Sequence, residues 1–317
     1  MSQKRVVSDA EFAEFTRPSL RLFMSADLEG STRLKQKRGR NSSSWMADIC
    51  KFYNQFLSLF DAEISRRAID FKTEKPDCPT VWKMLGDEII FVVKIAHQID
   101  AKLFLGAFHR AVEVWNNDLT QGILERGELR VKGAAWTAGF PVCNTLIETP
   151  DNREDYTGPS IDAGFRLSKL ASPRRFAVSA DLAWLLCHTG FEKDILFEGT
   201  AELKGVADDS GYPILWIKVG DSKYTDLENE LLGRLACTRD KVQNLCAAYV
   251  QEFGVPNHLP FLGENTDFNR PPDGFDRELA VVRDFLQKEI FEVKAGDESG
   301  KQPAADEREE LLSKIPG

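Results

Sequence analysis

An aspartate at the end of an apolar strand pattern most restricts how this chain can fold. Residues 19–27 (SLRLFMSAD) predict a buried strand that stops at Asp27, and a turn containing Gly30 follows at once. Backbone N–H groups of Leu28 to Thr32 would then point at whatever a cation on Asp27 binds, which suits a polyphosphate. The alternative is an ordinary capping or turn aspartate.

The order of strand and helix patterns predicts an α+β fold. Strand patterns surround a Gly86–Asp87 turn, which favours a hairpin. The order is β-α-β-β-α-β, then α-β and a closing hairpin, which is typical of a ferredoxin-like antiparallel sheet with helices packed on it. Strands are expected at 19–27, 80–85, 88–95, 129–140, 174–180, 197–205 and 211–219, and helices at 45–65, 98–118, 160–171 and 180–188.

The sequence divides into four expected segments. An N-terminal segment (1–18) precedes the α+β domain (19–220), in which 71–79 and 148–159 read as loops. Helical patterns at 225–253 and 276–292 predict a helical extension over 221–294. The polar residues 295–317 predict a flexible tail.

Composition excludes several classes of partner. A net charge of −9 argues against a nucleic-acid binder that works by general basicity, although local basic residues can still hold a small anion. Six cysteines without a CxxC motif predict free thiols in a reducing cytoplasm rather than a zinc site. The N-terminus has no apolar leader, and the longest apolar run (89–93) is too short for a membrane, so we expect a soluble cytoplasmic protein.

Asp87 supplies a second carboxylate at the tip of the predicted hairpin. A hairpin at the sheet centre would bring Asp87 beside Asp27. Two such carboxylates repel each other unless divalent ions lie between them, and oxygen ligands favour Mg²⁺ or Mn²⁺. For this motif alone, the alternative is an ordinary Gly-Asp turn.

Two later stretches offer cationic groups. In DYTGPSIDAGFRL, Asp155 precedes a Gly-Pro turn, and Asp162 and Arg166 share a helix face at i and i+4. Arg166 can point at phosphoryl charge, or the two residues form a minor surface ion pair. Lys204, in ELKG before the last strand, can reach a phosphate or remain solvated.

In this order the motifs resemble those of the class III nucleotidyl cyclases. FMSADLEGST resembles the first metal motif, F-x-D-(I/L)-x-G-(F/S)-T, and KMLGD resembles K-x-x-G-D. DAGFR resembles the helix motif N-x-x-x-R, and LKG supplies the late K-G. The resemblance covers about residues 19–219. It implies an enzyme that converts a nucleoside triphosphate to a 3′,5′-cyclic nucleotide and pyrophosphate.

The resemblance also implies roles for particular residues. Asp27 and Asp87 would bind two Mg²⁺ or Mn²⁺ ions, with the backbone carbonyl of Leu28 as a further ligand. The turn through Gly30, Ser31 and Thr32 would cradle the phosphates. Arg166 would stabilise charge on the α-phosphoryl group and Lys204 would neutralise the pyrophosphate. Asp162 stands where the family has a ribose-orienting asparagine; its carboxylate can accept a hydrogen bond from a ribose hydroxyl but cannot donate one, and it adds a negative charge near the phosphates.

Family sites lie between two chains. The metal ligands come from one protomer, and the base pocket and the arginine come from its partner. The resemblance therefore implies a head-to-tail homodimer with two equivalent sites and an inactive monomer.

The residues do not decide which nucleotide base the predicted enzyme accepts. Lys83 and Asp155 match the pair with which adenine-specific members read ATP, but the same donor and acceptor also suit uracil. Tyr53 is either a core aromatic or a residue that shortens the base pocket to one ring. With its SADLEGST motif, Asp162 in the ribose position and a C-terminal helical extension, the chain resembles in particular the uridylate and cytidylate cyclases of bacterial Pycsar antiphage systems. UTP is preferred slightly over CTP, because the N4 amine of cytosine would meet Lys83 donor to donor. The alternatives are an ATP-specific cyclase and an inactive nucleotide-binding module.

Overall fold

The computed structural model describes residues 4–38, 44–71, 78–119, 129–148, 154–206, 211–233, 238–253 and 274–294. Contacts divide the chain into two units, residues 18–279 and a terminal unit of residues 1–17 with 280–317. None of the described helices combines the length and apolar content needed to cross a membrane.

The larger unit is built on a seven-stranded sheet with the spatial order β3-β4-β2-β5-β8-β10-β9. Every neighbouring pair is antiparallel except β5 and β8. β2 is paired on both sides, and it continues two residues beyond Asp27 because β5 still pairs with it there. The strands are β2 (Ser19–Glu29), β3 (Thr80–Leu85), β4 (Glu88–Ile95), β5 (Arg130–Phe140), β8 (Arg175–Val178), β9 (Ile195–Ala201) and β10 (Tyr212–Lys218).

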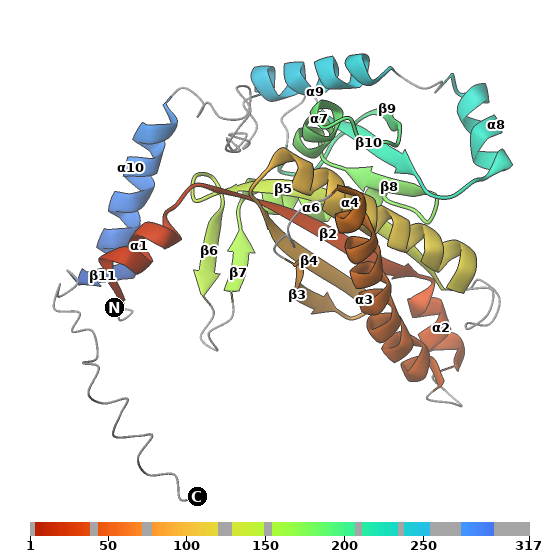
Figure 1. The fold of residues 1–317 in the computed structure, drawn as a ribbon, viewed down its shortest axis with the longest axis horizontal. Helices are drawn as coiled ribbons and strands as arrows, with labels where there is room; N and C mark the ends of the chain where they lie inside the picture. Colours follow the sequence, from red (N-terminus) through yellow and green to blue (C-terminus); the bar gives the residue numbers. More distant parts are fainter. Residues whose placement is uncertain are drawn as a thin grey trace, which may run out of the picture. The chain divides into compact units, whose positions relative to one another are not determined.

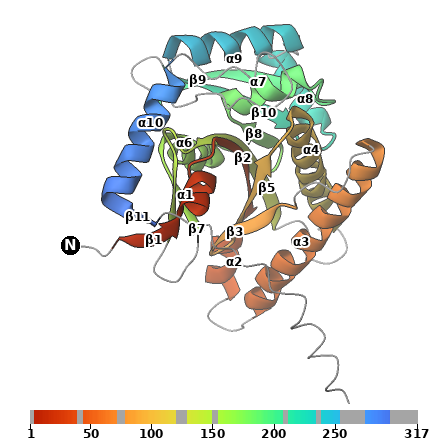
Figure 2. The ribbon, with the colours of Figure 1, turned by 60° about the vertical axis from the view of Figure 1, so that its left-hand side comes forward.

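Helices cover both faces of this sheet. The long helices α3 and α4 run side by side across one face (Figures 1 and 2), while α6 lies on the opposite face. The predicted helix 225–253 is two helices, because Gly233 with φ of +65° ends the first. The helices are α2 (Ser31–Arg38), α3 (Ser44–Phe71), α4 (Gln98–Val114, continued by a π-helical turn Trp115–Leu119), α6 (Pro159–Leu167, continued by a 3₁₀ turn Ser168–Leu170), α7 (Ala180–His188), α8 (Lys223–Leu231) and α9 (Arg239–Phe253).

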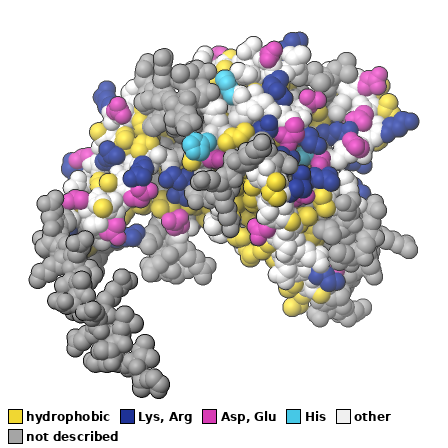
Figure 3. Space-filling view, in the orientation of Figure 1, with side chains coloured by type: hydrophobic (Ala, Val, Ile, Leu, Met, Phe, Trp, Pro, Cys, Tyr) yellow, Lys and Arg dark blue, Asp and Glu magenta, His cyan; other side chains and the backbone are white. Residues whose placement is uncertain are grey.

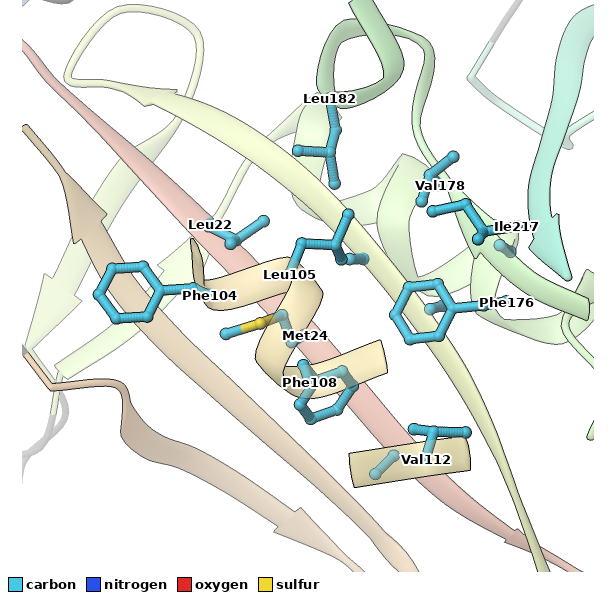
Figure 4. Packing of buried hydrophobic residues seen from close by; sticks show 14 of the residues in the cluster. Leu22, Met24, Phe104, Leu105, Phe108, Val112, Phe176, Val178, Leu182 and Ile217 are labelled. Atoms are coloured by element: carbon cyan, nitrogen blue, oxygen red, sulfur yellow. The ribbon is translucent and has the colours of Figure 1, made fainter. Parts of the chain in front are cut away.

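The main core lies between the sheet and α3, α4 and α7. Figure 4 shows Phe104 and Phe108 of α4 close to Leu22 and Met24 of β2, with Phe176 of β8 beside them. All five side chains are essentially inaccessible to solvent. Alternate residues of β2 face this core, which is why the strand reads as apolar while its other face remains free for Phe23, Ser25 and Asp27.

A second, aromatic cluster fills the face under α6. The rings of Phe23 and Trp136 stack with centroids 5.6 Å apart, and Trp82 and Phe165 contact them. Gly164 of α6 packs directly against Trp136, so closely that a Cβ at this position would lie 2.2 Å from the indole ring. The glycine therefore lets α6, with Asp162 and Arg166, lie close against the sheet.

The predicted loop 148–159 is wrong in part, since the structure has a hairpin there. β6 (Thr145–Glu148) pairs with β7 (Glu154–Thr157) in antiparallel register. Leu146 and Tyr156 face each other across this pair and contact the aromatic cluster. The alternation of apolar and polar residues in β6 and β7 is too short to predict strands. Packing against the aromatic cluster stabilises them despite their low intrinsic strand propensity.

The terminal unit joins the two ends of the described chain. β1 (Arg5–Ser8) pairs in parallel with β11 (Phe291–Lys294), and α1 (Asp9–Phe15) follows β1 (Figure 2). α10 (Phe275–Phe285) ends in a π-helical turn (Leu286–Ile290) before β11, where a helix to residue 292 was predicted. Val7, Leu286 and Phe291 form its small core. The predicted tail 295–317 lies outside the described residues.

His109 of α4 should make the protein sensitive to acid. Burial lowers the pKa of His109 from 6.5 to about 4, and its Nε2–H donates to the Lys218 carbonyl at 2.8 Å. Above pH 6.5 the ring is neutral in the folded and unfolded chains alike. Between pH 6.5 and 4 only the unfolded chain gains the proton, so the free energy of unfolding should fall by about 3 kcal/mol.

Urea unfolding at several pH values measures this slope. His109→Gln keeps a donor for Lys218 but does not titrate, so its stability should depend less on pH over this range. His97→Gln, at an exposed position before α4, is the matched control and should retain the wild-type slope. An unchanged slope in His109→Gln would refute the assignment.

Candidate functional site

Asp27 and Asp87 lie side by side at one end of the sheet. In the β2–β4 pairing Asp27 is opposite Glu88, and the Leu28 backbone N–H donates to the Asp87 carbonyl at 3.2 Å. Asp87 itself occupies the tip of the β3–β4 hairpin, where Gly86 has φ of +70°. The sheet therefore brings the two carboxylates of the predicted metal site together.

Cationic and hydroxyl groups contact both carboxylates. Lys132 of β5 makes an ion pair with Asp27 at 2.8 Å. The Ser31 hydroxyl donates to Asp87, and Lys35 of α2 approaches the same carboxylate at 3.7 Å. Each acidic side chain is thus already compensated by a positive or donor group.

Glu88 adds a third carboxylate at the same place. It accepts a hydrogen bond of 2.5 Å from the Ser25 hydroxyl. Burial raises the pKa of Glu88, and the negative charges of Asp27 and Asp87 add to this shift. The combined negative charge of Asp27, Asp87 and Glu88 favours the binding of cations here.

The turn after β2 contains a glycine in the left-handed region of backbone conformation and leads directly into α2. Gly30 has φ of +87°, a conformation that favours glycine, and α2 starts at Ser31. Ser31 is buried against Asp87, whereas Thr32 is exposed. The Leu28 side chain is buried in the main core, so only its backbone is available to a ligand.

The donor chemistry of this end of the sheet fits Mg²⁺ or Mn²⁺. The carboxylates of Asp27 and Asp87 are hard oxygen ligands with no sulfur or imidazole beside them in the described contacts. No group of three or more His, Cys, Asp or Glu side chains within the described ranges is arranged to hold a metal ion. Two carboxylates suit Mg²⁺, which usually completes its shell with water and substrate phosphates.

Tyr53 lies at the hairpin tip. Its hydroxyl donates to the Gly86 carbonyl at 2.7 Å, and its ring is partly buried against the main core. Burial, followed by the charge of Asp87, raises the pKa of Tyr53, so the hydroxyl remains a donor. The ring is fixed next to Asp87, and its predicted effect on a base stays a prediction.

The two predicted base-reading residues meet. Lys83 of β3 and Asp155 of β7 form an ion pair of 2.8 Å, and both side chains are about one-third exposed. The Lys83 ammonium also lies 4.5 Å from the centre of the Trp82 ring. A ligand can therefore reach one donor and one acceptor held in fixed positions.

α6 carries Asp162 and Arg166. The helix starts at Pro159 after Gly158, and the side-chain Oδ1 of Asn144 accepts a hydrogen bond from the Ser160 backbone N–H at 3.1 Å. Asp162 is exposed, and Arg166 is half-buried with an Nε that has no hydrogen-bond partner. The described contacts include no ion pair between these two residues, so the alternative of a minor surface i,i+4 pair is not observed.

Lys204 lies far from the two aspartates within one chain. It is exposed in the turn after β9, at the opposite edge of the sheet from β3. Four strand-to-strand steps separate β2 from β9, or about 19 Å, beyond the reach of a lysine side chain. A site that uses both Asp27 and Lys204 must therefore take them from two chains.

Charged side chains of both signs are scattered over the described part of the visible surface, with hydrophobic side chains between them (Figure 3). In Figure 3 the basic side chains of the described residues stand among acidic ones. The ion pairs Arg175–Glu198 and Lys218–Asp226 are examples from β8 and β10.

Comparisons with known proteins find the fold but no family. No family model matches the chain, and no curated protein matches it. The adenylyl cyclase CyaB from P. aeruginosa is 17% identical, with a TM-score of 0.45 over 65% of this chain and 97% of that one. The guanylate cyclase domain of RhGC from Catenaria anguillulae, solved with GTP, is 10% identical, with a TM-score of 0.46 over 65% and 100%.

A third structure gives a similar result. The adenylate/guanylate cyclase/hydrolase from Silicibacter pomeroyi is 14% identical, with a TM-score of 0.44 over 65% of this chain and 99% of that one. The seven-stranded sheet with its packed helices confirms the predicted α+β fold, and this fold is similar to those of the adenylyl and guanylyl cyclase structures above. The similarity is one of fold.

Four residues at the site were not predicted. Glu88 and Ser25 lie on β4 and β2, Lys132 lies on β5, and Lys35 lies on α2. The sequence shows that Glu88 directly follows Asp87. Ser25 and Lys132 could have been singled out because each is a hydrophilic residue inside an apolar strand pattern, 19–27 or 129–140. The cross-strand register that unites them was not visible.

Proposed function

We propose that the chain is a nucleotidyl cyclase that converts a nucleoside triphosphate to its 3′,5′-cyclic monophosphate and pyrophosphate. The observation that carries the proposal is the proximity of Asp87 to Asp27, since the Leu28 backbone N–H next to Asp27 donates to the Asp87 carbonyl, beside the turn at Gly30. Two bound Mg²⁺ or Mn²⁺ ions would supply Lewis-acid activation of the ribose 3′-hydroxyl and neutralise phosphate charge. Asp27, Asp87 and the Leu28 carbonyl would hold them.

The protein's own groups have separate tasks in this reaction. The 3′-oxygen attacks the α-phosphorus and forms a new P–O bond, its proton passes to solvent water, and the bond from the α-phosphorus to the pyrophosphate oxygen breaks. Backbone N–H groups from Gly30 to Thr32 would hold the β- and γ-phosphates. Arg166 would stabilise charge on the α-phosphoryl group, and Lys204 would hold the departing pyrophosphate.

The site is proposed to form between two copies of the chain. The sheet separates Lys204 from Asp27 by four strand-to-strand steps, so one chain alone lacks a complete set. The edge strand β3 also exposes apolar side chains, with Val81, Met84 and Leu85 between 38% and 51% accessible. A head-to-tail homodimer would supply the missing groups and cover apolar surface.

Uracil is the preferred base. Lys83 would donate to a uracil carbonyl while Asp155 accepts the N3–H, which uses both partners of the observed ion pair. Cytosine presents its N4 amine donor to Lys83, a less favourable match. Adenine offers an acceptor and a donor as well, so an ATP-specific cyclase is the second candidate. Tyr53, fixed on Gly86, would favour the smaller ring.

The cyclic product is proposed to act as a second messenger in antiphage defence. Support comes from the SADLEGST motif, from Asp162 in the ribose position and from the C-terminal helices, features that together resemble the Pycsar pyrimidine cyclases. The presence of Asp27, Asp87 and Arg166 together argues against an inactive nucleotide-binding module.

One experiment separates these candidates. Purified protein is incubated with ATP, GTP, CTP or UTP and Mn²⁺, and the products are resolved by chromatography and mass spectrometry. Cyclic UMP as the main product is the expected result. Cyclic AMP alone would overturn the pyrimidine assignment, and no cyclic product from any base would favour the binding module.

A further inference from the structure

Glu88 lies beside the two predicted metal ligands, and the reaction above gives it no task. Glu88 faces Asp27 across the β2–β4 pair, where opposite side chains lie about 5 Å apart. The Ser25 hydroxyl, which is buried on the same face of β2, donates to Glu88 at 2.5 Å. Glu88 is therefore held in place next to Asp27 rather than extended into solvent.

The local charges do not balance. Asp27 pairs with Lys132 at 2.8 Å, and Asp87 has Lys35 at 3.7 Å. Glu88 bonds a neutral hydroxyl, and the described residues make no ion pair with it. Three carboxylates therefore stand against two ammonium groups, and Glu88 supplies the excess negative charge.

We propose that the negative charge of Glu88 makes the site bind divalent cations before it binds the nucleotide. This inference rests on the proposed function. The net negative charge attracts cations to Asp27 and Asp87 and repels a triphosphate that carries no metal. Without the charge of Glu88, the two lysines balance the two aspartates, and a metal-free nucleotide meets a neutral site.

Glu88 acts through the electric field, since no three acidic side chains among the described residues are arranged around one ion. Charges about 5 Å apart on a half-buried face are weakly screened, so removing one unit charge should change ion affinity about tenfold or more. The effect on a metal-free triphosphate has the opposite sign, because the nucleotide is an anion. This opposition distinguishes a charge effect from loss of structure, which would weaken both ligands.

Glu88→Gln tests the inference with binding measurements that require no turnover. Mn²⁺ binding without nucleotide is measured by electron paramagnetic resonance of the free ion. UTP binding in excess EDTA is measured by calorimetry. In Glu88→Gln, Mn²⁺ should bind about tenfold more weakly and metal-free UTP about tenfold more tightly. Glu29→Gln, which removes an exposed charge at the end of β2, is the matched control and should change both affinities little.

The outcomes separate this inference from the proposed function. Unchanged Mn²⁺ affinity in Glu88→Gln, or an equal loss in Glu29→Gln, would overturn the role of Glu88. Weaker binding of both Mn²⁺ and UTP in Glu88→Gln would also overturn it in favour of a structural role. Asp27→Asn tests the metal site itself: if it binds Mn²⁺ as the wild type does, the proposed function fails as well.

Discussion

Replacing Asp27 with alanine should reduce formation of the cyclic product by about 1,000-fold or more, because the metal site loses one of its two side-chain ligands. The protein should remain folded. Asp27 is partly exposed, and its ion pair with Lys132 contributes at most about 1 kcal/mol at such a position. Its removal also relieves repulsion from Asp87 and Glu88.

Product formation and urea unfolding, measured on the same preparation, check this result. Glu29→Ala is the matched control, since it removes an exposed acid from the same strand and should retain activity. Retained activity in Asp27→Ala would remove the two-metal mechanism. Loss of activity together with unfolding would instead assign Asp27 to stability.

Mixing two inactive variants should restore activity. Asp27→Ala damages the metal half of the site, and Arg166→Gln damages the half on α6. If the halves come from different chains, a heterodimer of the two variants contains one site with both changes and one wild-type site. Random exchange of equal amounts makes half the dimers mixed, so activity should recover to about a quarter of the wild type.

The measurement needs each variant alone, the mixture after subunit exchange, and wild type at the same total concentration. A mixture of Asp27→Ala with Asp87→Ala is the control, because both changes damage the same half and no dimer has an intact site. No recovery in the first mixture would show that Arg166 acts within its own chain, or not at all. Arg166→Gln is checked by circular dichroism, because the arginine is half-buried.

The sequence allowed the central features to be predicted because local patterns carry them. The apolar run before Asp27 and the Gly86–Asp87 turn each specify a strand or hairpin, and neighbouring elements of this order form one sheet. The meeting of Lys83 with Asp155 follows once β7 and β3 are placed near the aromatic cluster. Their roles in binding a base stay predictions.

Contacts between strands could not be predicted from the same patterns. Glu88 and Lys132 both neighbour Asp27, but only the register of β2 with β4 and β5 makes this so. A slip of one residue would send these side chains to the opposite face. A single sequence predicts the strands more reliably than the register between them. It therefore could not show which charged side chains lie around the predicted metal ligands.

Long-range pairing explains the remaining misses. β6 and β7 are short and polar, and Tyr156 becomes buried only through the aromatic cluster. β11 pairs with β1 from the other end of the described chain, at a sequence distance over which no local periodicity applies. A helix was therefore predicted to continue through Phe291, where the chain instead forms a strand.

The parallel pairing of β1 with β11 affects how this protein can be handled. Arg5 to Ser8 and Phe291 to Lys294 supply each other's main-chain partners. Trimming one end would leave an orphaned edge with Val7 or Phe291 uncovered, which invites aggregation. Affinity handles and fluorescent reporters are better inserted at an exposed position such as Gly233, just after α8, than substituted for either end.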